Sequence, residues 1–176
     1  MSGHNKWSQI RRQKGKSDAK KSQLFGKLGK LIAVEARKAN GNRESAGLKT
    51  AIERARAENM PSDSIERAIK KAMGENGAVM ESIVYEAYGP GGCALIIEAL
   101  TTNRNKAAQE IKHILSDNGG NLAAMGAAAW AFQKTGMEWK PQTTVPLEEN
   151  DVAALAKLVD TLEANEEVHA VYTNAE

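Results

Sequence analysis

The sequence predicts an α+β protein in which a basic three-helix bundle, residues 1–78, precedes an acidic α+β domain, residues 79–176. Apolar residues recur at helical spacing in the first part, whereas the second part contains apolar runs separated by turn signals. Charge is segregated in the same way: Lys and Arg outnumber Asp and Glu by 18 to 8 in the first part and are outnumbered by 6 to 14 in the second. With 176 residues, both parts are long enough to bury a core.

The first predicted helix lies within SDAKKSQLFGKLGKLIAVEARKAN, residues 17–40. Its apolar residues recur at helical spacing, with lysines between them: Leu24, Leu28, Leu31 and Ile32. Gly26 and Gly29 weaken this helix by about 1 kcal/mol each relative to alanine. The NGN sequence at 40–42 is expected to end it.

Two shorter helices complete the predicted bundle. The second, about residues 45–58, places four apolar residues on one face: Leu48, Ala51, Ile52 and Ala55. The third lies within NMPSDSIERAIKKAMGENG, where Pro61 stands near the start, Ser62 or Asp63 would be the N-cap, and Glu66 would complete a capping box. Its inward face is expected to hold Ile65, Ile69 and Met73.

The acidic part changes from helical to strand periodicity. IVYEAYGP and CALIIEALT indicate strands joined by a GPGG turn, and NKAAQEIKHILSDNGG is an amphipathic helix that ends at its glycines. AAAWAFQKTG and MEWKPQTTVPL indicate two strands with a tight turn at Lys134–Gly136, followed by a helix in ENDVAALAKLVDTLEANEE and a closing strand, VHAVYT. Without the leading strand, which would add an extra edge strand, this order is the ferredoxin-like β-α-β-β-α-β pattern.

Several classes of function find no support in the sequence. Cys93 is the single cysteine, so a disulfide framework and a cysteine-based metal cluster are excluded, and a reducing cytoplasmic location is expected. The histidines His4, His113 and His169 show no metal-ligand spacing. YGPGG lacks the pattern of a phosphate-binding loop, and no apolar run approaches the ~20 residues needed to span a bilayer. We therefore expect no enzyme activity, cofactor, metal, membrane or small-molecule substrate.

The basic part has the charge expected of a polyanion-binding surface. Residues 1–38 carry 11 Lys or Arg against 2 acidic residues. Such a cationic segment can neutralise phosphates, and the release of their counterions drives binding. The candidate residues are His4, Lys6, Trp7, Arg11, Arg12, Lys14, Lys16, Lys20, Lys21, Lys27 and Lys30. Arg67, Lys70 and Lys71 of the third helix either extend this field or form a solvated helix face.

Trp7 allows two interpretations. Beside Lys6 it offers a flat surface on which bases of single-stranded or looped RNA can stack. Alternatively, it folds back as a hydrophobic lid on the helical bundle, because buried aromatic residues are common anchors. The sequence leaves both interpretations open.

A second candidate patch is TTNRNK, residues 101–106. Thr101, Thr102 or Asn103 can cap the helix that follows, and cations near exposed helix N–H groups can hold a phosphate or the edge of a base. Plain N-capping with two exposed cations is the alternative. The candidate binding residues here are Asn103, Arg104, Asn105 and Lys106.

Several separate motifs resemble one family. GHNKWSQIRRQKG, DAKK, NMPSDSIERAI, YEAYGPGG, TTNRNKAAQEIKH and NGGNL occur in the order and spacing of the YebC/PmpR family, which includes the mitochondrial translational activator of cytochrome oxidase. The resemblance covers residues 1–136 and resumes over LVDTLEANEEVHAVYTN. One departure is that FQKTG runs directly into MEWKPQTTV, where family members carry an additional small α+β domain.

The resemblance implies a three-helix domain followed by α+β structure, no catalysis and a role in gene expression. Family members are described either as DNA-binding transcriptional regulators or as ribosome-associated factors that help translation through difficult stretches such as proline runs. We prefer the second reading, with ribosomal RNA or tRNA as the partner and DNA as the alternative. The family residues found here are Gly3, His4, Lys6, Trp7, Ile10, Lys14, Asn103, Arg104 and Asn105.

Overall fold

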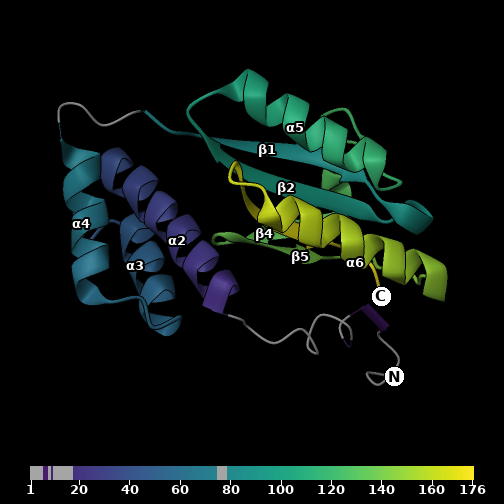
Figure 1. Ribbon diagram of the computed structural model, residues 1–176, viewed down its shortest axis with the longest axis horizontal. Helices are drawn as coiled ribbons and strands as arrows, with labels where there is room; N and C mark the ends of the chain where they lie inside the picture. The colour runs from purple at the N-terminus through teal and green to yellow at the C-terminus, as the bar shows by residue number, and fades with distance from the viewer. Residues whose placement is uncertain (1–5, 8, 10–17, 75–78) are drawn as a thin grey trace. The chain divides into compact units, whose positions relative to one another are not determined.

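A computed structural model shows that the chain divides into two compact units (Figure 1). One unit is Lys16–Ser82, and the other is Ile83–Glu176 together with Met1–Gly15. The order of helices and strands along the chain confirms the α+β class, with a helical part followed by a βα part. The residues that the structure describes are 6, 7, 9, 18–74 and 79–176.

The described residues of the helical unit form three helices: α2 (Asp18–Lys38), α3 (Ala46–Ala57) and α4 (Ser62–Met73). The α2 helix packs against both α3 and α4. The core confirms most of the predicted inward faces: Leu28, Leu31, Ile32, Leu48, Ala51, Ile52, Ala55, Ile65 and Ile69 are buried. Leu24 is only half-buried, and Met73 is 41% exposed because it lies in the last turn of α4, beyond this core.

The predicted capping box at the start of α4 is wrong. Pro61 occupies the N-cap position, no side chain there makes a capping hydrogen bond, and Ser62 is already helical. The Pro61 carbonyl accepts from the N–H groups of Ser64 and Ile65 (3.0 and 3.1 Å). The Glu66 carboxylate, which would have completed the box, instead accepts a hydrogen bond from the Arg43 guanidinium. A charged partner on a neighbouring loop has therefore replaced the local cap.

Among its described residues, the α+β unit contains six strands and two long helices. Its main sheet has the strand order β3-β1-β2-β6, and β4 and β5 form a separate two-stranded sheet. The register of the antiparallel β2–β6 pair is set by Ile96 opposite Tyr172. The bounds are β1 (Glu81–Tyr88), β2 (Ala94–Thr101), α5 (Arg104–Asp117), β3 (Asn121–Leu122), β4 (Phe132–Thr135), β5 (Glu138–Pro141), α6 (Glu149–Ala164) and β6 (Val168–Thr173).

Strand β2 is the centre of this unit because both of its faces are covered. Leu95 and Ile97 belong to the hydrophobic cluster that includes the inner faces of α5 and α6, and both are fully buried. Ile96 points to the opposite face, where it joins a second cluster with Phe132 and Trp139 of the β4–β5 hairpin. The sheet is thus a middle layer between two helices and a hairpin (Figure 1).

The strand pairing differs from the predicted ferredoxin-like arrangement. The strands predicted in AAAWAFQKTG and MEWKPQTTVPL pair with each other, from Phe132 opposite Pro141 to Thr135 opposite Glu138, rather than entering the main sheet. Ala129–Ala131 form a 3₁₀ turn instead of strand. The β1 strand is also internal, because the short β3 strand lies beyond it. Periodicity identifies extended residues but does not specify their pairing partners, which explains these differences.

Candidate nucleic-acid interface

The first basic segment is described only in part. His4, Arg11, Arg12, Lys14 and Lys16 lie outside the described residues. Of the candidates that remain, Lys6 is exposed, and Trp7 is buried with 9% of its surface accessible.

Trp7 belongs to the hydrophobic cluster of the α+β unit. The same cluster holds Leu147 of the loop before α6 and Leu155 and Leu158 of α6. The predicted alternative to base stacking was a lid on the helical bundle. The structure instead places the indole in the cluster of the other unit. Burial of this ring favours packing over base stacking, because an anchored aromatic presents little surface to a ligand.

The helical unit displays most of the other candidate cations. Lys20 and Lys21 are exposed at the start of α2, and Lys27 and Lys30 are half-buried further along it. On α4, the exposed candidates are Arg67, Lys70 and Lys71. The packing of α2 against α4 places both sets in one compact unit.

The cations of α4 differ in the contacts that their side chains make. The Arg67 side chain bends back onto its own helix, where its guanidinium donates to the Asp63 carbonyl (3.4 Å) and the Ser64 hydroxyl (3.2 Å). Lys70 and Lys71 lie in the last turn of α4, where a positive charge is favoured by the helix dipole. The exposed lysines of α2 and α4 therefore place positive charge at the surface of this unit.

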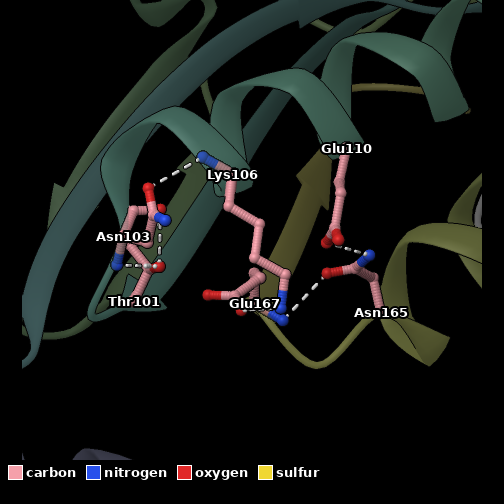
Figure 2. Close-up of polar contacts among 6 residues, drawn as sticks. All are labelled: Thr101, Asn103, Lys106, Glu110, Asn165 and Glu167. Carbon is pink, nitrogen blue, oxygen red and sulfur yellow. Dashed lines mark hydrogen bonds and ion pairs between the residues drawn. The ribbon is translucent and has the colours of Figure 1, made fainter.

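The candidate patch in TTNRNK forms a helix cap (Figure 2). The Asn103 side-chain oxygen accepts from the backbone N–H of Lys106 (3.1 Å), as expected for an N-cap. The buried Thr101 hydroxyl accepts from the Asn103 N–H and donates to its carbonyl, both at 2.9 Å. This part of the motif therefore has a structural task, which is to start α5 directly after β2.

Lys106 takes part in an acidic network (Figure 2). Its ammonium group pairs with the carboxylate of Glu167 at 3.2 Å, and hydrogen bonding to Glu167 with further attraction from Glu110 and Glu166 raises the pKa of Lys106. Glu110 in turn accepts from Asn165 (3.0 Å). The acidic neighbours lower the attraction of this corner for phosphate. Arg104 and Asn105 are exposed there.

The described residues contain little that suggests catalysis. Cys93 is fully buried, and burial raises the pKa of its thiol, so it is a poor nucleophile. His113 is largely exposed, and its Nε2 atom lies 3.0 Å from a carboxylate oxygen of Asp117. Within residues 18–74 and 79–176, no group of three or more His, Cys, Asp or Glu side chains could hold a metal ion. None of the helices in these ranges is long and apolar enough to cross a membrane.

Sequence analysis missed a buried carboxylate that organises an exposed loop. Glu86 of β1 is 8% exposed and accepts hydrogen bonds from the N–H groups of Gly126 (2.6 Å), Ala128 (2.9 Å) and Ala129 (2.6 Å). This loop exposes 97% of Met125 and 63% of Trp130. Glutamate is rarely buried without partners. The position of Glu86 between apolar residues of a predicted strand could therefore have indicated a buried carboxylate with hydrogen-bond partners.

Comparisons with known proteins agree over nearly the whole chain. The family described as TACO1/YebC protein N-terminal domain matches residues 5–75, and TACO1/YebC second and third domain matches residues 80–138 and 134–175. A conserved hypothetical protein from Aquifex aeolicus has a crystal structure that matches with a TM-score of 0.83 and 31% identity, covering 97% of this chain and 96% of that one.

Curated relatives are named as probable transcriptional regulatory proteins. One from Pseudothermotoga lettingae is 51% identical and covers 82% of this chain, and one from Halothermothrix orenii is 46% identical and covers 95%. The chain spans 58% and 65% of the length of these two relatives. A third, from Pelotomaculum thermopropionicum, is 37% identical over 240 residues, covering 100% of this chain and 99% of its own.

The position of the additional residues follows from these matches. The alignment of 240 residues is longer than this chain of 176, so the Pelotomaculum relative contains residues without a counterpart here. The two matches to the second-and-third-domain family overlap at residues 134–138, which run from the end of β4 through the turn to the first residue of β5. The expected departure from the family pattern therefore lies at this hairpin. With both family models matched in chain order, this protein belongs to the TACO1/YebC family.

Proposed function

We propose that this protein is a non-enzymatic nucleic-acid-binding regulator that acts on the ribosome. In this proposal the helical unit binds ribosomal RNA or tRNA, and the protein helps elongation through difficult stretches such as proline runs. The relatives' names describe regulators of gene expression and support the coarser part of this statement.

The supporting observation is the separation of charge between the two units. The helical unit, residues 16–82, has 14 Lys or Arg against 9 Asp or Glu, a net charge of +5, and the α+β unit, residues 83–176 with 1–15, has 10 against 13, a net charge of −3. On α2 and α4, lysines are exposed outside the buried core, so contact with phosphates would leave that core intact. A field of this kind attracts a polyanion to one unit and leaves the other unit free for protein contacts.

Duplex DNA is the second candidate, because the curated relatives are named as transcriptional regulators. A recognition helix reads base edges with residues near its N-terminus. The start of α4 carries the exposed carboxylate of Asp63, which opposes entry into a groove lined by phosphates, whereas the Glu66 carboxylate is paired with Arg43. The charge at this helix start therefore favours RNA binding through lysines over sequence reading in DNA.

We expect neutralisation of three exposed lysines of the helical unit to weaken ribosome binding. The variant replaces Lys20, Lys21 and Lys70 by glutamine. For single-stranded RNA held through five to eight phosphates, the slope of log K against log salt should be about −4 to −6, and the variant should lower its magnitude by about 2. Ribosome co-sedimentation at physiological salt and RNA binding at several salt concentrations measure both effects.

A matched control changes the net charge by the same amount in the other unit. It replaces the exposed residues Lys112, Lys140 and Lys157 by glutamine and should keep ribosome binding close to the unmodified level. A gel shift on duplex DNA is run in parallel. Loss of binding by both variants alike, or absence from translating ribosomes combined with tight duplex binding, would overturn the ribosomal proposal.

A further inference from the structure

The helical unit contains an open groove of about 690 Å³ along α2 and α4. Eight of the twelve described residues that line it are glycine, alanine, valine or methionine, and the other four are cations. None of these twelve is acidic. The cations are Lys30, Arg37, Lys38 and Lys71. The groove therefore combines an apolar floor with a positive rim, in a unit whose main core is already buried elsewhere.

The rim of this groove is formed by cations. Lys38 pairs with Glu35 at 3.2 Å, which offsets part of its charge. Arg37 and Lys71 are exposed, and Lys30 is half-buried. These cations surround apolar surface, so the carboxylates and the aliphatic groups of one ligand would be drawn to the same groove.

Two glycines keep the floor of this groove low. A Cβ atom added at Gly26 would meet nothing within 4 Å, and one added at Gly29 would meet only the Met60 methyl group at 3.9 Å. The packing of the unit therefore does not require glycine at either position, although glycine weakens a helix relative to alanine. Together with the cationic rim, this open space indicates a surface that receives a partner.

We propose that this groove binds an amphipathic helix of a partner protein, with aliphatic side chains on one face and carboxylates beside them. Along α2 the lining runs from Gly26 to Lys38, which corresponds to about 18 Å of helix, or roughly three turns. That length suits a partner helix with anchors at i, i+3, i+4 and i+7. Charge complementarity with the rim selects an acidic partner.

Two other occupants fit less well. Nucleic acid would contact the cations but would leave the apolar floor without a matching group, since the twelve described lining residues include no aromatic ring on which a base could stack. A second copy of this chain would have to supply an acidic helix, and α6 is its best candidate. The apolar face of α6 is already buried, with Val152, Leu155 and Leu162 in the core of its own unit.

The test uses the full chain and a labelled peptide of about fifteen residues, with Leu at i, i+3, i+4 and i+7 and with Glu and Ala elsewhere. Fluorescence anisotropy measures its affinity. We expect saturable binding, and at least tenfold weaker binding of a peptide in which Gln replaces Leu. A peptide in which Lys replaces Glu should also bind at least tenfold more weakly, because the rim repels it.

Paired variants of the protein locate the binding site. Gly26→Leu fills the groove from a position with open space around its Cβ and should weaken binding at least tenfold, whereas Gly26→Ala should change it by threefold or less. Lys71→Glu should likewise weaken binding at least tenfold. Its control is Lys70→Glu, which makes the same charge change at an exposed neighbour outside the lining, with an effect of threefold or less.

The outcomes separate this proposal from the ribosomal one. The peptide assay contains neither RNA nor ribosomes, and its groove variants, Gly26→Leu and Lys71→Glu, change none of the three lysines tested for ribosome binding. No peptide binding, or equal effects of each variant and its control, would overturn the groove proposal. So would a loss of RNA affinity in Gly26→Leu without any change for the peptide, because the groove would then be a nucleic-acid site. Thermal unfolding of each variant confirms that the helical unit is folded.

Discussion

Replacing Glu86 by alanine is expected to lower the free energy of unfolding of the α+β unit by about 3 kcal/mol or more. The carboxylate accepts from three backbone N–H groups, those of Gly126, Ala128 and Ala129, at 2.6 to 2.9 Å. Hydrogen bonds to a charged acceptor are stronger than neutral ones, and the alanine variant would leave three donors without their partner. The nearby Tyr88 hydroxyl donates to the Ala127 carbonyl, and this single hydrogen bond would not replace the three that Glu86 accepts.

Graded variants distinguish loss of these hydrogen bonds from a general effect of substitution. In Glu86→Gln one oxygen can still accept from Ala128 and Ala129, but the amide group faces the Gly126 N–H, so an intermediate loss of about 1–2 kcal/mol is expected. Glu148→Ala removes an exposed carboxylate that makes no capping bond and should cost less than about 1 kcal/mol. Chemical denaturation measures all three, and hydrogen exchange at Gly126, Ala128 and Ala129 reports on the loop. An unchanged stability of Glu86→Ala would contradict this role.

The same carboxylate should make stability depend on acid pH. Burial opposes ionisation of Glu86, but the three N–H donors outweigh it, so its pKa lies below the ordinary value of 4.5. The unfolded chain therefore takes up this proton at a higher pH than the folded one. The stabilising contribution is complete above pH 4.5 and is lost as the pH falls through the depressed folded pKa. The stability difference between the unmodified protein and Glu86→Gln should accordingly shrink below pH 4.5; a difference that stays constant down to acid unfolding would contradict this account.

Local sequence signals specify the elements of this fold better than their partners. Leu28, Ile32 and Leu48 lie on the predicted helix faces because an amphipathic helix must bury its apolar stripe. The pairing of β4 with β5 alone could not be predicted in this way. Its cause is non-local: β2 exposes apolar residues on both faces, so a hairpin containing Phe132 must cover the face opposite α5 and α6.

The candidate site shows the same limit. The surplus of lysine on α2 and α4 follows directly from the sequence, because exposure of lysine is the ordinary outcome. The ion pair of Lys106 with Glu167 did not, since it joins residues far apart in the chain. For Asn103, the hydrogen bond from the Lys106 N–H shows the N-capping role that the sequence offered as the alternative.

Replacing Trp7 by alanine is expected to destabilise the α+β unit by about 3 kcal/mol, the lower end of the range for removing a buried aromatic ring. The indole lies in one cluster with Leu147, Leu155 and Leu158, and its removal would leave a cavity against α6. Trp7→Phe keeps much of the apolar volume and should recover more than half of the loss. Denaturation of the three proteins, followed by far-ultraviolet circular dichroism, gives these values.

Trp130 supplies the matched control, because it is the same residue type in the same unit and is 63% exposed. Trp130→Ala should cost less than about 1 kcal/mol, since little apolar surface is lost from the interior. RNA affinity measured well below the unfolding midpoint then separates the two interpretations of Trp7. If the ring packs against the unit, Trp7→Ala lowers stability while RNA affinity changes by no more than about threefold. If it stacks on a base, RNA affinity falls by 1–3 kcal/mol at unchanged stability, as is typical of lost stacking.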